Sequence, residues 1–77
     1  MYEETLIKYG RVIRILRQER NISQEHFGDL CGLHRTYISD VELGKRNVSL
    51  ENIARMAAAL GVQISDIFVE VEKDAGI

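Results

Sequence analysis

Apolar residues recur every three or four positions along most of this chain, which places them on one face of a helix. The first such stripe consists of Tyr9, Val12, Ile13 and Leu16. Asn21 follows it, and asparagine is one of the few residues that readily adopt the left-handed conformation that ends a helix. The pattern predicts a first helix over residues 4–20.

A short helix is predicted next, over residues 24–31. Ser23 is a favourable N-cap, because its hydroxyl oxygen accepts a hydrogen bond from a free backbone N–H of the first turn. Gly32 is suited to end the helix, because glycine adopts positive φ without steric cost. Phe27 and Leu30 are predicted to point inward.

A third helix is predicted from residue 34 or 35 to residue 43, ending at Gly44. Its apolar face consists of Tyr37, Ile38 and Val41. Its polar face consists of Arg35, Thr36 and Ser39. Two short helices joined by a tight turn that contains glycine, the second polar on its outer face, form a helix-turn-helix. We therefore predict this motif over residues 23–43.

Two more helices complete the pattern. Ser49 is predicted to cap a helix over residues 50–60, which Gly61 ends. The inward residues expected there are Leu50, Ile53, Ala54, Ala57 and Leu60. Ser65 is predicted to cap a fifth helix over residues 65–72, whose apolar face consists of Ile64, Ile67, Phe68 and Val71. The fold class expected for residues 1–77 is all-α, a single domain of five helices.

Composition excludes several classes of function. Cys31 is the single cysteine and is expected to be a small buried hydrophobe, so nothing indicates an oxidising compartment. His26 and His34 are too isolated for a metal site. No nucleophile–base constellation or phosphate loop indicates an enzyme, and no cofactor or small-molecule ligand is expected. Without a signal peptide or an apolar run of ~20 residues, a cytoplasmic protein is expected.

The charges are unevenly distributed, although the net charge is −2. Residues 1–48 hold eight bases and seven acids, whereas residues 49–77 hold two bases and five acids. Such polarity can orient a protein on a phosphate backbone even when the total charge is negative.

The polar face of the third predicted helix has two interpretations, a solvated helix surface or a surface that reads DNA. An α-helix with its side chains is about 10–12 Å across, and the major groove is about 12 Å wide. Arg35 can offer two N–H groups to guanine O6 and N7, and the Thr36 methyl can contact a thymine methyl. Ser39 lies one turn beyond Arg35 on the same face.

Other polar residues are candidates for phosphate contacts. Gln24 begins the second predicted helix, where free N–H groups favour an anion. Tyr37 is ambiguous, because its ring can pack inward while its hydroxyl reaches a phosphate. Two basic residues and an amide follow the third helix and would fix the orientation of the protein on the DNA without reading the base sequence. These residues are Lys45, Arg46 and Asn47.

The stretch "RILRQERNISQEHFGDLCGLHRTYISDVELGKRNVSLENIARMAAALGV" resembles the lambda-repressor-like, or Xre-type, helix-turn-helix family of bacterial and phage regulators, and the resemblance extends over residues 10–68. Within this family, "LHRTYIS" followed by "GKRN" is similar to the controller proteins of restriction–modification systems. The resemblance implies a five-helix DNA-binding domain.

The resemblance also implies roles for individual residues. Gln24 matches a phosphate-contacting position, and Asp40 lies near the DNA-reading surface. Arg17 and Glu42 match an ion pair that joins the first helix to the recognition helix. The positions that match base-facing residues are Arg35, Thr36 and Ser39.

The function predicted from these observations is a sequence-specific transcription regulator that binds double-stranded palindromic DNA as a homodimer, since one recognition helix reads too few base pairs. The fifth helix is expected to supply the dimer interface, through Ile64, Ile67, Phe68 and Val71. Its targets would be its own promoter and a restriction–modification operon. The alternatives are a general repressor of the same family, or an antitoxin whose acidic C-terminal segment binds a partner protein.

Overall fold

The structure is a computed structural model and describes residues 2–73. Five helices follow one another along the chain: α1 (Tyr2–Glu19), α2 (Gln24–Cys31), α3 (Arg35–Glu42), α4 (Leu50–Leu60) and α5 (Ile64–Lys73). These bounds confirm the five predicted helices to within a few residues. Within residues 2–73 there is no β-strand.

Four of the predicted helix boundaries are confirmed in atomic detail. The Ser23 hydroxyl accepts a hydrogen bond from the His26 amide at 3.0 Å, and the Ser49 hydroxyl accepts one from the Asn52 amide at 3.1 Å. Gly32 adopts φ 72° at the turn of the helix-turn-helix, where a residue with a Cβ would be strained. Asn21 takes the left-handed conformation with φ 57°.

The predicted cap of α5 is wrong. The helix begins at Ile64, one residue before Ser65, so Gln63 occupies the cap position. The Asp66 carboxylate reaches back and accepts a hydrogen bond from the Gln63 amide at 2.9 Å. This is half of a capping box, in which the acidic side chain of the first turn satisfies a backbone donor that the helix leaves free.

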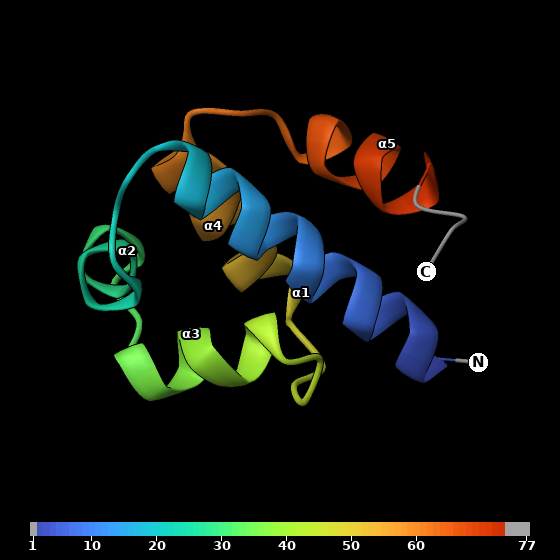
Figure 1. The fold of residues 1–77 in the computed structure, drawn as a ribbon, viewed down its shortest axis with the longest axis horizontal. Helices are drawn as coiled ribbons and strands as arrows, with labels where there is room; N and C mark the ends of the chain where they lie inside the picture. The colour runs from blue at the N-terminus through green and yellow to red at the C-terminus, as the bar shows by residue number, and fades with distance from the viewer. Residues whose placement is uncertain (1, 74–77) are drawn as a thin grey trace.

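Helix α1 lies between α3 on one side and α5 on the other (Figure 1). Gly10 permits the contact with α3, because a Cβ there would lie 2.2 Å from the Val41 carbonyl oxygen. The remaining two helices, α2 and α4, pack against each other and close the far end of the bundle. As a result, α3 is held by α1 and α2 while its outer face stays open to solvent.

One hydrophobic core joins the helices, and its largest fully buried side chains are Phe27, Ile13, Ile38, Met56, Ile67 and Val41. Burying a side chain of this size stabilises the fold by roughly 1.5–3 kcal/mol. The Tyr9 hydroxyl donates a hydrogen bond to Met56 Sδ at 3.3 Å, which satisfies the one polar atom of this ring inside the core. Burial also raises the pKa of Tyr9 above its ordinary value.

Several residues predicted to point inward are exposed instead. Leu30 is 52% exposed and Leu50 is 74% exposed, and Ala54 is exposed as well. In α2, Phe27 and Cys31 take the inward positions one turn apart, which turns Leu30 outward. Leu50 is the first residue of α4, where no other helix covers it.

Two of the four residues predicted to form a dimer interface belong to the core of the protomer. Ile67 is 0% exposed and Val71 is 5% exposed, so neither side chain is available to a partner. Both face α1 and α4, because α5 has a single inward stripe. Ile64 and Phe68 remain at the surface, with Ile64 37% exposed and Phe68 half-buried.

Candidate nucleic-acid interface

The first turn of α3 presents free polar side chains to solvent. Arg35 and Thr36 are exposed, and Ser39 is half-buried one turn further along. His34 caps the helix, because its Nδ1 accepts a hydrogen bond from the Thr36 amide at 3.1 Å. The Arg35 side chain makes no hydrogen bond or ion pair with any of residues 2–73. These groups are therefore available to an external ligand.

The predicted ion pair between Arg17 and Glu42 is present and joins α1 to α3. Arg17 Nε donates to Glu42 Oε2 at 2.6 Å, and Nη2 donates to Oε1 at 3.0 Å. The side chains are 11% and 3% exposed. A two-pronged pair of this kind restricts the relative rotation of the two helices, because both N–H groups must stay in the plane of the carboxylate. It thus fixes the angle at which α3 is presented.

Two further contacts extend this ion pair into a network. Arg17 Nη1 donates to the Ile22 carbonyl oxygen at 2.9 Å. Gln24 Nε2 donates to Glu42 Oε1 at 3.1 Å, which ties the start of α2 to the end of α3. The sequence predicts a phosphate contact for Gln24 and gives no signal for this link to Glu42. The network therefore joins α1, α2 and α3 and fixes how they are oriented relative to one another.

The loop after α3 is organised by Arg46. Its guanidinium lies 5.1 Å from the centre of the Tyr37 ring, and its Nε is 3.4 Å from the Asp40 carboxylate. The Tyr37 hydroxyl accepts a hydrogen bond from Asn52 Nδ2 at 3.1 Å, so its own proton remains available to another acceptor. Lys45 and Asn47 are exposed beside it. Arg46 is thereby held next to α3.

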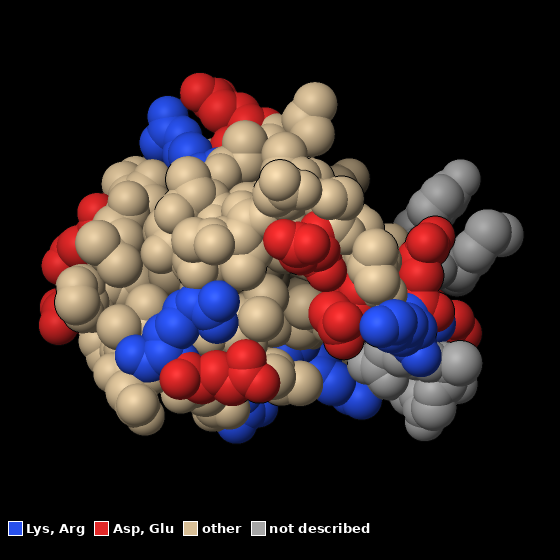
Figure 2. All heavy atoms as spheres, turned by 90° about the horizontal axis from the view of Figure 1, so that it is seen from above, with Lys and Arg blue, Asp and Glu red and all other residues tan. Residues whose placement is uncertain are grey.

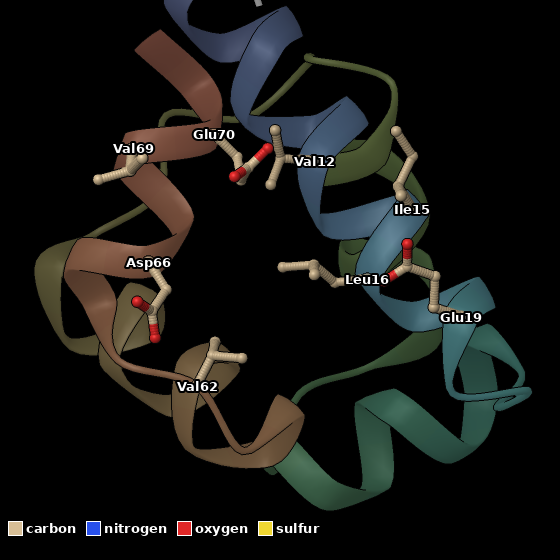
Figure 3. A pocket seen from close by; sticks show the side chains of 8 residues that line it. All are labelled: Val12, Ile15, Leu16, Glu19, Val62, Asp66, Val69 and Glu70. Atoms are coloured by element: carbon tan, nitrogen blue, oxygen red, sulfur yellow. The ribbon is translucent and has the colours of Figure 1, made fainter. Parts of the chain in front are cut away.

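The side of the molecule that carries α5 has a different character. A groove of about 450 Å³ runs between α1 and α5. Figure 3 shows apolar side chains along it, with carboxylates of Glu19, Asp66 and Glu70 at its edges. Seen from the same side, acidic and basic side chains are interspersed among uncharged ones, without a continuous basic patch (Figure 2). Carboxylates at this groove would repel a phosphate backbone, so this side is unsuited to DNA.

Three further features concern Cys31, metal-ligating side chains and membrane-spanning helices. Cys31 is buried, and burial raises the pKa of its thiol to about 11, although the charge of Arg55 acts in the opposite direction, so the thiol is protonated at neutral pH. Residues 2–73 contain no group of three metal-ligating side chains placed to hold an ion. None of the helices among those residues is long and apolar enough to span a membrane.

Some structural roles had no signal in the sequence. Asn52 lies fifteen positions from Tyr37, and only the tertiary fold brings the amide at the start of α4 to the hydroxyl of α3. Arg20, which looks like a solvated base in the sequence, donates from Nε to the Leu60 carbonyl oxygen at 2.8 Å. It satisfies a free carbonyl at the end of α4, as basic side chains often do.

Comparison with known proteins agrees with this geometry. A family model described as helix-turn-helix matches residues 13–67. The chain is 44% identical over 69 residues to control protein C.MunI from Mycoplasma sp, which covers 88% of this chain and 93% of that protein. It is 52% identical over 60 residues to control protein C.BamHI from Bacillus amyloliquefaciens, which covers 77% of this chain and 74% of that protein.

The fold is also similar to solved structures. The restriction–modification controller protein C.AhdI from Aeromonas hydrophila superposes with a TM-score of 0.80 at 44% sequence identity, covering 82% of this chain and 96% of that one. The wild-type restriction–modification controller protein C.Esp1396I superposes with a TM-score of 0.82 at 30% identity, covering 90% of this chain and 88% of that one.

Proposed function

We propose that this chain reads palindromic operators as a homodimer. It belongs to the Xre-type helix-turn-helix family of DNA-binding transcription regulators and is homologous to restriction–modification controller proteins. Arg35, Thr36 and Ser39 would contact base edges in the major groove. The residues assigned to backbone phosphates are Gln24, Tyr37, Lys45, Arg46 and Asn47.

The observation that carries this proposal is the unoccupied first turn of α3. Arg35 is exposed and has no partner among residues 2–73, although two other bases beside α3, Arg17 and Arg46, are paired with carboxylates. A free guanidinium at the start of a rigidly oriented helix suits bidentate recognition of guanine. A solvated helix face would need no such orientation.

A homodimer follows from the size of the site. One recognition helix covers a few base pairs, whereas two copies related by a twofold axis read half-sites about 34 Å apart. Exposed and half-buried apolar groups around the start of α4 and on α5 support an interface there. Val48, Ile53 and Phe68 line a shared hollow, and Leu50 lies one turn before Ile53. We therefore assign Leu50, Ile64 and Phe68 to the interface.

The proposed target is the chain's own promoter together with a restriction–modification operon. This assignment is supported by homology to the control proteins and by the two controller-protein structures. Dimerisation would make occupancy depend steeply on protein concentration, because two protomers must associate to reach both half-sites. Regulation would thus be delayed until the regulator accumulates.

Selection of bound sites from random duplex DNA tests the proposal. We expect enrichment of a palindrome whose half-site centres are about one helical turn, ~34 Å, apart. Enrichment of single, unpaired half-sites would contradict the homodimer. If no sequence is enriched even at low salt, where phosphate contacts are strongest, the DNA-binding proposal is wrong and a partner-protein role such as that of an antitoxin takes its place.

Phe68→Asp is expected to convert the dimer to a monomer that binds the operator weakly. The new carboxylate would be buried against the partner, but it would also disturb the stacking of Phe68 on Tyr9, whose ring centres are 5.6 Å apart. Leu50→Asp avoids this ambiguity, since Leu50 is 74% exposed and outside the core. Sedimentation equilibrium measures the oligomeric state of both variants.

Val69→Asp is the matched control for these interface variants. Val69 is 49% exposed on the same helix as Phe68 but lines the groove against α1 instead. We expect this variant to remain dimeric. An intact dimer in Leu50→Asp, or a monomer in Val69→Asp, would place the interface elsewhere on the protomer.

A further inference from the structure

A second hollow opens on the α3 side of the bundle, with a volume of about 260 Å³. Arg14 lines it from α1, Gln24 from α2, and Ser39 from α3. We propose that Arg14 binds a phosphate of the DNA backbone in this hollow, beside Gln24. This inference rests on the proposed function and adds a residue of α1 to the DNA-binding surface.

The charge balance of the hollow supports an anion as its ligand. Glu42 also lines it, but that carboxylate already accepts two hydrogen bonds from Arg17 and one from Gln24. Its negative charge is therefore compensated within the protein. Arg14 is exposed and has no hydrogen bond or ion pair with any described residue. The hollow consequently carries one unbalanced positive charge.

The position of the hollow favours a phosphate of the backbone over a base. In the proposed complex, Ser39, one turn into α3, would reach into the major groove of the DNA, whereas Gln24, at the start of α2, would lie beside that groove. A backbone that follows the edge of the groove past Gln24 would pass within reach of an arginine side chain from α1. The planar guanidinium is well matched to two phosphate oxygens.

Arg11 provides a matched control on the same helix. It is exposed and carries the same charge one turn before Arg14, but it lines a hollow with Glu70 and Lys73 of α5. That hollow belongs to the side of the molecule that carries the α1–α5 groove. Replacement of either arginine by alanine changes the net charge equally, so any difference between the variants reports the location of the charge.

The test measures the affinity of wild type, Arg14→Ala and Arg11→Ala for the selected operator and for an unrelated duplex, from about 50 to about 200 mM KCl. Each lost phosphate contact lowers the slope of log affinity against log salt by about 0.9. We expect Arg14→Ala to lower the slope by about two units per dimer on both duplexes. The loss of affinity that Arg14→Ala causes relative to wild type should therefore be about tenfold smaller at about 200 mM KCl than at about 50 mM KCl.

Arg14→Lys distinguishes a phosphate contact from a purely structural role of Arg14. It should retain most of the salt dependence, because a lysine still neutralises a phosphate, whereas a structural role would not be restored by charge alone. Equal slopes for Arg14→Ala and Arg11→Ala would overturn the assignment of Arg14 while leaving the operator binding of wild type intact. Absence of salt-dependent binding by wild type would instead overturn the proposed function and this inference with it.

Discussion

Glu42→Ala is expected to lower the free energy of unfolding by about 3–5 kcal/mol, because it leaves the charge of Arg17 buried without a partner. Glu42 is 3% exposed and accepts hydrogen bonds from both Arg17 and Gln24. A domain of 77 residues has a total stability of roughly 4–12 kcal/mol, so this loss is a large share of it. Urea denaturation followed by circular dichroism measures the change, and the thermal midpoint should fall by about 12–40 °C.

Glu51→Ala is the control for this variant. Glu51 also pairs with an arginine, Arg55, at 3.3 Å, but the two side chains are 76% and 45% exposed. Loss of this pair should cost at most about 0.5 kcal/mol, because solvent screens it. A double replacement of Arg17 and Glu42 by methionine and leucine should recover much of the lost stability. Equal losses of unfolding free energy in Glu42→Ala and Glu51→Ala would show that the buried pair stabilises the fold no more than the exposed pair does.

Arg35→Ala is expected to abolish discrimination at one base-pair position in each half-site. The lost bidentate contact to guanine is worth about 1–3 kcal/mol, which reduces affinity for the correct operator by about fivefold to 150-fold per half-site. Because the Arg35 side chain is exposed and makes no hydrogen bond or ion pair with any described residue, the stability of the fold should not change. Site selection from random duplex DNA, run in parallel with wild type, measures the loss of preference at each position.

Lys45→Ala provides the comparison for Arg35→Ala. Lys45 is exposed in the loop after α3 and is assigned to a phosphate, so its removal should weaken binding to all sequences evenly. The selected palindrome should therefore stay the same. If Arg35→Ala also leaves the palindrome unchanged, the residue does not read a base. If Lys45→Ala alters the palindrome, the two assignments must be exchanged.

These two largest effects are connected through α3. Arg35 can reach a base edge only if the helix enters the groove at the correct angle, and the pair of Arg17 with Glu42 sets that angle from the other end of the helix. Replacement of the pair by apolar residues that restore stability would therefore separate the effect of the pair on stability from its effect on operator binding. Stability would be recovered, while operator binding would depend on whether packing alone restores the orientation.

The helices could be predicted from the sequence, because local chemistry determines where each of them begins and ends. Ser23, Gly32 and Ser49 act through hydrogen bonds and dihedral angles within one turn of chain, so their effects could be predicted without the rest of the fold. The polar face of α3 was equally predictable, because helical periodicity alone separates Thr36 from Ile38. The pairing of Arg17 with Glu42 required a resemblance to a known family, since 25 positions separate the two residues.

Only the tertiary structure decided which side of each helix is covered. Periodicity shows that Ile67 and Leu50 lie on apolar stripes, but it cannot show that α1 buries the first and that nothing covers the second. The same holds for charge: Arg11 and Arg14 look equivalent in the sequence, yet one lies toward α5 and the other toward α3. The sequence by itself thus determined the elements and the chemistry they carry. The packing of α1 between α3 and α5 decided which of those groups are free to meet a ligand, because burial depends on residues far away along the chain.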